Sequence, residues 1–174
     1  MREKYWSLSK MDKTKSFAFV SGHSFQKPAK DDWFTPKWIF DALKLEFDLD
    51  VCAPKEGVSW IPTKAHYSLD DDGLSQDWKG LRVWMNPPYS KPTDWIVKFR
   101  NNNNGVALIP TTIGKWWLDL YNDERAKWLA LPPMRFIDSF GNVASNTMPS
   151  RAWLVAIGES NITALKMSGL GVIR

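Results

Sequence analysis

Short segments in which apolar residues alternate with polar ones, or run together, predict β-strands along this chain. Phe47–Ala53 alternates apolar and polar positions and stops at Pro54, which is typical of a strand that ends in a loop. Leu81–Met85 and Val106–Pro110 are apolar runs bounded by turn-forming residues, which indicates buried strands. Further strand signals cover residues 65–69, 127–131, 135–137 and 152–157.

Helical spacing is found in three segments between these runs. The apolar positions of residues 38–43 share one helical face, with Thr35 expected as N-cap and Pro36 as the first helical residue. Residues 95–100 predict a second helix, which begins near Thr93 and ends in an asparagine run. Residues 116–121 predict a third, shorter helix.

This order of strands and helices predicts an α/β fold with a mostly parallel sheet and helices on both faces. Residues 1–30 lack such a pattern and are expected to form an irregular arm before a single domain over 31–174. In such folds ligands bind where the carboxyl ends of the strands meet. Two strands end in unusual turns, at 50–54 and 86–89, so the chemistry of the protein is expected there.

Composition narrows the class of protein. The 174 residues suffice for one domain with a core, and no apolar run approaches the length of a membrane span. The N-terminus is charged from residue 2 and lacks an apolar signal core, so a cytoplasmic location is expected. The single cysteine, Cys52, excludes an internal disulfide and argues against a Cys-rich zinc site, and no metal is expected.

Charge and aromatic content are compatible with a nucleic-acid partner without requiring one. The net charge is +4, which suits a polyanionic partner but is common without one. The chain has 11 tryptophans, of which some are expected in the core and a minority on surfaces that stack on bases.

Asn86-Pro87-Pro88-Tyr89, directly after an apolar strand, is the motif that carries the chemistry. The amino nitrogen of a nucleobase is a poor nucleophile because its lone pair is delocalised into the ring. The Asn86 side-chain oxygen and the Pro87 carbonyl could accept hydrogen bonds from its two N–H groups, and two prolines fix the chain without a competing N–H. Tyr89 offers a flat ring on which an extracted base can stack. The alternative is a rigid Pro-Pro turn with a packed tyrosine.

With these residues the chain resembles the small bacteriophage-type DNA N6-adenine methyltransferases (Dam-like), over residues 32–157. The resemblance implies a Rossmann-like methyltransferase fold and S-adenosylmethionine as methyl donor. It also implies methylation of the N6 amine of adenine in double-stranded DNA by base flipping and direct in-line displacement, within a bacterial host, as in restriction-modification systems. Its catalytic residues would be Asn86, Pro87, Pro88 and Tyr89.

The same resemblance assigns the cofactor-binding residues, which fall in three segments: Phe34, Thr35 and Pro36; Asp50, Val51, Cys52 and Ala53; and Asp72, Gly73 and Leu74. Asp50 would accept hydrogen bonds from the ammonium of the cofactor, although a turn aspartate is the alternative. Thr35 and Pro36 would bring helix N-terminal amides to its carboxylate, although plain helix capping fits equally. Asp72 and Leu74 would bracket its adenine, unless the acidic run is simply solvated. The chain departs from the family in lacking a Gly-rich cofactor loop and a clear ribose-binding acid, for which Asp70 and Asp71 are the nearest candidates.

Lys91, Lys115, Arg135 and Arg151 are the candidate DNA contacts. Each could equally be a solvated surface charge, but a few together should contact phosphate. The polar loop at 139–150 suits a mobile cover or a groove contact. Because the chain has little room for a separate recognition domain, sequence reading must come from loops or from the tail, and a monomer is plausible.

Three other functions fit parts of the pattern. A methyltransferase could act on RNA amino groups or on protein glutamine amides, because these too are planar, conjugated NH2 groups. A catalytically silent nucleic-acid-binding module could keep the fold. A structural protein with a Trp-rich core would explain the tryptophans but not the Asn-Pro-Pro-Tyr turn.

Overall fold

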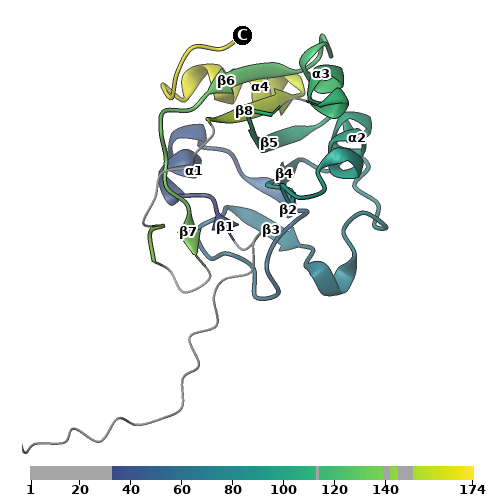
Figure 1. Cartoon of the computed structure of the whole chain (residues 1–174). Coiled ribbons are helices and arrows are strands. Elements are labelled where there is room, and N and C mark those ends of the chain that lie inside the picture. The colour runs from purple at the N-terminus through teal and green to yellow at the C-terminus, as the bar shows by residue number, and fades with distance from the viewer. Residues whose placement is uncertain (1–32, 113, 139–141, 145–150) are drawn as a thin grey trace, which may run out of the picture.

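A six-stranded sheet forms the centre of the protein in the computed structural model, which describes residues 33–112, 114–138, 142–144 and 151–174 (Figure 1). The expected arm at 1–30 and most of the polar loop at 139–150 lie outside these residues. The strands lie in the order β3-β2-β4-β5-β8-β6. Their bounds are β2 Phe47–Asp50, β3 Thr63–His66, β4 Val83–Met85, β5 Gly105–Pro110, β6 Lys127–Ala130 and β8 Ala152–Ile157. A separate two-stranded sheet pairs β1 (Trp33–Phe34) with β7 (Ile137–Asp138).

Strand direction departs from the expected mostly parallel sheet in one place. β3, β2, β4 and β5 pair in parallel, as predicted, but β8 lies antiparallel between β5 and β6, so the sheet is mixed. Parallel neighbours need a crossover connection that is usually a helix. The connection from β6 to β8 contains no helix in its described part, and the chain returns beside β6 in the opposite direction.

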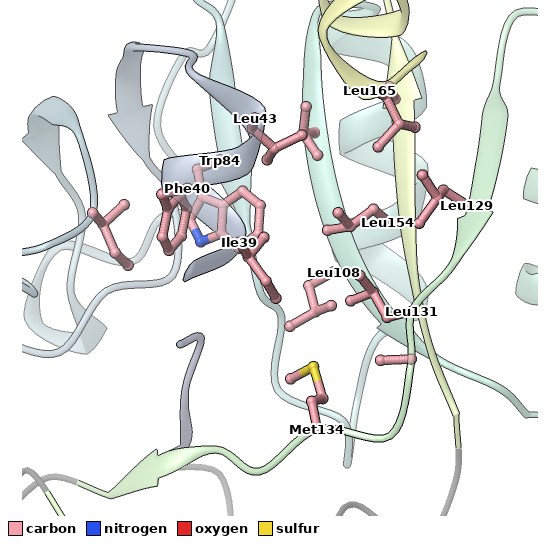
Figure 2. Close-up of a cluster of buried hydrophobic side chains, with 14 of the residues drawn as sticks. Ile39, Phe40, Leu43, Trp84, Leu108, Leu129, Leu131, Met134, Leu154 and Leu165 are labelled. Atoms are coloured by element: carbon pink, nitrogen blue, oxygen red, sulfur yellow. The ribbon is translucent and has the colours of Figure 1, made fainter. Parts of the chain in front are cut away.

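Helices cover both faces of the sheet, as predicted (Figure 1). Their bounds are α1 Lys37–Leu43, α2 Thr93–Asn102, α3 Lys115–Tyr121 and α4 Glu159–Met167. Figure 2 shows α1 and α4 on one face, where Ile39, Phe40 and Leu165 pack with Trp84 and Leu154 of the sheet. On the other face α2 and α3 pack on a second cluster of buried side chains. Because both faces are covered, β4 and β5 at the centre of the sheet are apolar throughout, and every one of their residues is buried.

Several elements differ from the sequence prediction, and the strands expected at 65–69 and 135–137 lie at 63–66 and 137–138. The strand expected over Phe47–Ala53 ends at Asp50, because the Asp50 carboxylate accepts the backbone N–H of Cys52 at 3.1 Å and turns the chain. α4 was not predicted, since its helical signal is weak and only Asn161 and Leu165 are buried on it. Among the described residues, no helix is long and apolar enough to cross a membrane.

Candidate active site

The chain changes direction across the sheet between β2 and β4. From β2 it continues to β3 on one side, and it then crosses to β4 on the other side. In open α/β sheets such a switch point leaves a crevice beyond the carboxyl ends of the strands. A cavity of about 730 Å³ lies there, with Asp50 and Val51 from the end of β2 and Asn86 from the end of β4 in its wall.

Most of the predicted cofactor and catalytic residues line this cavity. They are Phe34, Thr35, Asp50, Val51, Cys52, Ala53, Asp72, Gly73, Asn86 and Pro88. Pro36, Leu74, Pro87 and Tyr89 are not among its lining residues. Four segments far apart in the sequence therefore meet around one hollow, while the roles assigned to their residues stay predictions.

Asp50 is a buried acid in the cavity wall. It is only 3% exposed, and its hydrogen bond from the Cys52 N–H satisfies one side of the carboxylate. Burial raises the pKa of Asp50 to about 7, against the smaller opposing effects of that hydrogen bond and of His66 on β3. A carboxyl with such a pKa changes its protonation state near pH 7. A bound cation would favour its charged form.

Thr35 does not cap α1 as expected. The N-cap is Pro36, and no side chain caps the helix. The Thr35 carbonyl instead accepts a hydrogen bond from Trp60 Nε1 at 2.9 Å, and the Phe34 ring lies 6.5 Å from the Trp60 ring. The Thr35 hydroxyl is buried and has no hydrogen-bond partner among the described residues. A buried polar atom in a cavity wall without a partner is a natural contact for a ligand.

The acidic run after β3 divides into three separate environments. Asp71 closes a capping box on Ser68, accepting its N–H at 2.8 Å and its hydroxyl at 2.7 Å, and these hydrogen bonds lower the pKa of Asp71. Asp70 faces the cavity and forms an ion pair with Lys55 at 2.8 Å. Asp72 has a left-handed backbone (φ 49°) and also lines the cavity. Asp71 is thus engaged structurally, and Asp70 is the better placed of the two ribose candidates.

The turn at 86–89 follows a strand that is buried at every position. The Pro88 carbonyl accepts the N–H of Lys91 at 3.2 Å, which folds the turn back before α2 begins. No backbone N–H of the described residues donates to the Pro87 carbonyl. The rigid turn therefore leaves Asn86 at the cavity and the Pro87 carbonyl outside the backbone hydrogen-bond network.

Tyr89 packs away from the cavity in this structure. Its ring lies edge-on to Phe136 at 6.3 Å, and burial strongly raises the pKa of its hydroxyl. The hydroxyl has no hydrogen-bond partner among the described residues. Stacking of Tyr89 on a base would need its ring to turn toward the cavity, so that role stays a prediction.

Substituting Tyr89 by Phe is expected to leave the protein as stable as the wild type, or more stable by up to about 1 kcal/mol, because a buried hydroxyl without a partner is removed. Tyr89→Ala should destabilise it by about 3 kcal/mol through the lost ring. Urea unfolding of both variants measures the difference. A loss above about 1 kcal/mol in Tyr89→Phe would show that the hydroxyl has a partner in the folded protein.

The four candidate DNA contacts are exposed side chains at the same edge of the sheet as the cavity. Lys91, Lys115 and Arg135 follow β4, β5 and β6, and Arg151 precedes the antiparallel β8. Lys115 forms an ion pair with Asp119 at 2.6 Å and lines a second, smaller cavity of about 210 Å³ between α2 and α3. All four therefore lie beyond the strand ends on the side of the sheet where the chain leaves β4, and contact with DNA stays a prediction.

Several lining residues were missed by sequence reasoning, among them Lys55, Ser68, Leu69 and Trp95. Lys55 and Ser68 lie on the loops before and after β3, and only the pairing of β3 with β2 brings them to the cavity. Trp95 had a usable signal, because it stands in the first turn of the helix that follows the motif. Among the described residues, no group of three or more His, Cys, Asp or Glu side chains could hold a metal ion.

Comparison with known proteins shows which family the chain resembles. A family model described as DNA N-6-adenine-methyltransferase (Dam) matches residues 22–160. A DNA N-6-adenine-methyltransferase of Haemophilus phage HP1 (strain HP1c1) is 31% identical over 104 residues, which are 55% of this chain and 58% of that protein. One of Escherichia phage T1 is 28% identical over 118 residues, 60% of this chain and 48% of that protein.

The chain thus spans about half the length of the curated relatives it matches. No solved structure gives a significant match. The family model nevertheless covers well over half of the chain, and it includes every residue that lines the cavity. The chain therefore belongs to the DNA N-6-adenine-methyltransferase (Dam) family, which confirms the resemblance found in its sequence.

Proposed function

We propose that this protein transfers a methyl group from S-adenosylmethionine to the N6 amine of adenine in DNA. One observation carries the proposal: a buried acid, Asp50, and the amide of Asn86 end neighbouring parallel strands and line the same cavity. The first suits the ammonium group of an amino-acid ligand, and the second suits a planar amine. The phage proteins that this chain resembles are named for the same reaction.

The residues present fit the cofactor. Cavities for ligands of this size have volumes of roughly 300–1,000 Å³, and the cavity here has about 730 Å³. Asp50 would hold the ammonium, the unpartnered Thr35 hydroxyl would donate to the carboxylate, and Asp70 would accept from the ribose hydroxyls. When bound, S-adenosylmethionine supplies an electrophilic methyl group on a positively charged sulfur.

The chain's own task is then to bind and orient the amine. The Asn86 oxygen and the Pro87 carbonyl would accept hydrogen bonds from the two N–H groups of adenine, which favours a pyramidal and more nucleophilic nitrogen. Since the attack is a direct displacement, positioning contributes more than acid–base catalysis. The target atom is shielded in the duplex, so the base must leave the stack before it can enter the cavity.

DNA is the proposed substrate because the basic side chains lie at the same edge as the cavity. Lys91, Lys115, Arg135 and Arg151 would contact phosphates beside the extracted base. Such an enzyme would act on double-stranded DNA in the cytoplasm of a bacterial host. Methylation of RNA amino groups or of protein glutamine amides is the alternative outcome of the test below.

The acceptor test uses methyl-labelled S-adenosylmethionine with the purified protein and equal masses of double-stranded DNA, RNA and a protein mixture. We expect label in DNA, and the same reaction with Asn86→Ala as matched control should label DNA far more slowly. Label confined to RNA or protein would change the acceptor and leave the cofactor assignment standing. No label in any acceptor would contradict the proposed activity altogether.

Cys52 gives an independent test of where the cofactor binds, because it is the single cysteine of the chain and lines the cavity. Burial raises the pKa of its thiol, so modification by a small thiol reagent should be slow. Saturating S-adenosylmethionine should slow the modification by about tenfold or more, by covering the thiol. ATP at the same concentration is the control and should have little effect. An unchanged rate with a demonstrably bound cofactor would place the cofactor elsewhere.

A further inference from the structure

Lys98 on α2 reaches across to the loop that precedes β4. Its ammonium donates hydrogen bonds to the carbonyls of Leu74 at 2.6 Å and Gly73 at 3.4 Å, and to that of Gln76. A lysine ammonium has three donors and no acceptor, so these carbonyls match its full capacity. The charged side chain of Lys98 thus binds the backbone of the loop at 73–76. It belongs neither to the motif at 86–89 nor to the groups that take part in the proposed reaction.

Two tryptophans complete the contact between α2 and this loop. The Lys98 ammonium lies 4.7 Å from the ring of Trp78, which is only 2% exposed and whose Nε1 donates to the Gly73 carbonyl at 2.9 Å. The Trp95 ring stacks on Trp78 at 6.0 Å and lines the cavity. The Gly73 carbonyl therefore receives hydrogen bonds from both Lys98 and Trp78.

Gly73 lies so close to the Val51 carbonyl, just after β2, that no side chain would fit there. A Cβ atom at this position would lie 2.5 Å from the Val51 carbonyl and 3.1 Å from the Trp95 ring. Its neighbour Asp72 adopts a left-handed backbone, and both residues line the cavity. The position of this loop therefore sets the shape of one wall of the cavity.

We propose that Lys98 is a positioning residue that clamps residues 72–76 and so holds the cofactor-facing wall formed by Asp72 and Gly73. The inference rests on the proposed function, because it names the cofactor as the ligand of that wall. Desolvation lowers the pKa of Lys98, which agrees with an ammonium drawn into the loop by its carbonyl acceptors. The negative charges of Asp77 and Asp72 have the opposite effect: they raise the pKa of Lys98 and favour its charged form. Without the ammonium, the carbonyls of Leu74 and Gln76 lose their donor, and the loop can leave Val51 and Trp95.

Lys98→Met tests the clamp, because it keeps the length of the side chain and removes its donors. We expect the Kd and KM for S-adenosylmethionine to rise roughly tenfold, since hydrogen bonds to a charged group are lost and part of that loss falls on the bound state. The kcat at saturating cofactor and the KM for DNA should stay within about threefold, because the amine contacts at Asn86 are separate. Lys98→Arg should recover part of the affinity. Lys166→Met, at an exposed lysine on α4, is the matched control.

Hydrogen exchange separates a clamp from a general loss of stability. In Lys98→Met without cofactor, the amides of residues 72–78 should exchange faster while those of β4 and β5 keep their protection. Should Lys98→Met fail to fold, Trp78→Phe provides the second variant: it removes the N–H donated to Gly73, keeps the aromatic face, and should also raise the Kd for the cofactor.

The outcomes distinguish this inference from the proposed function. Cofactor binding and adenine methylation by the wild type, with an unchanged Kd in folded Lys98→Met and Trp78→Phe, would overturn the clamp and leave the proposed function intact. Uniformly faster exchange over the whole sheet in Lys98→Met would also overturn it, because the effect would then be global stability. A wild type that binds no S-adenosylmethionine would contradict the proposed function itself.

Discussion

Asn86→Ala is expected to lower kcat for adenine methylation by roughly 10³-fold, the effect of removing one well-placed polar group from an active site. The Kd for S-adenosylmethionine should change by less than about twofold, because the cofactor contacts come from other segments of the wall. The fold should tolerate the change, since Asn86 follows β4 and the buried strand itself is untouched. Single-turnover methylation and calorimetric titration with the cofactor measure the two quantities separately.

Asn86→Asp is the matched variant, because it keeps an acceptor oxygen of the same reach while adding charge. It should retain more activity than Asn86→Ala. If Asn86→Ala instead kept near-full activity, the turn at 86–89 would be a structural turn and the catalytic assignment would be wrong.

Asp50→Asn is expected to raise the Kd for S-adenosylmethionine by roughly 30-fold or more at pH 8, since one partner of a buried charge pair is removed. The hydrogen bond from the Cys52 N–H survives, because an asparagine oxygen can accept it in the same place. The cofactor-free variant should nevertheless be at least as stable as the wild type at pH 8. The reason is that the wild type must bury a charge there and the variant does not.

The raised pKa of Asp50 makes both the stability of the protein and its affinity for the cofactor depend on pH. Because the folded-state pKa of about 7 lies above the value of 3.8 for a free aspartate, the folded protein favours the protonated acid. The stability contributed by that protonated form is full below pH 3.8 and is lost as pH rises through 7. The affinity for the cofactor depends on pH in the opposite direction, because the ammonium of the cofactor binds the ionised carboxylate. This affinity should fall by about tenfold from pH 8 to pH 6.

Asp50→Asn controls for titration of the cofactor itself, since any pH dependence left in the variant belongs to the ligand. Thermal melts of the cofactor-free proteins and titrations across this range provide the data. Equal pH dependence of the Kd in both proteins would show that Asp50 does not contact the ammonium.

The sequence predicts the part of the site in which a polar residue directly follows an apolar strand. Asp50 and Asn86 each follow an apolar strand, and parallel strands deliver their carboxyl ends to one edge of the sheet, so local patterns were enough to place them together. Thr35 was misassigned as an N-cap because its identity fits that role, whereas the Trp60 hydrogen bond that fixes it spans 25 positions. No local pattern encodes such a contact.

The remaining errors also come from long-range pairing. The apolar sequence of β8 predicts a buried strand but not its direction, which only its antiparallel pairing with β5 and β6 shows. Lys98 looks like an ordinary helix lysine until the loop carbonyls of Leu74 and Gln76 are placed beside it. Trp84 lies in the core, as expected of some tryptophans, and Trp95 lines the cavity, but stacking of a tryptophan on a base stays a prediction.

The most direct test of the central claim is nucleoside mass spectrometry of unmethylated double-stranded DNA incubated with the protein and S-adenosylmethionine. The buried acid and the amide at the switch point predict N6-methyladenine in the digest, absent without cofactor and formed roughly 10³-fold more slowly by Asn86→Ala. DNA that carries no N6-methyladenine after incubation with a folded, cofactor-binding protein would contradict the assignment of adenine as the acceptor.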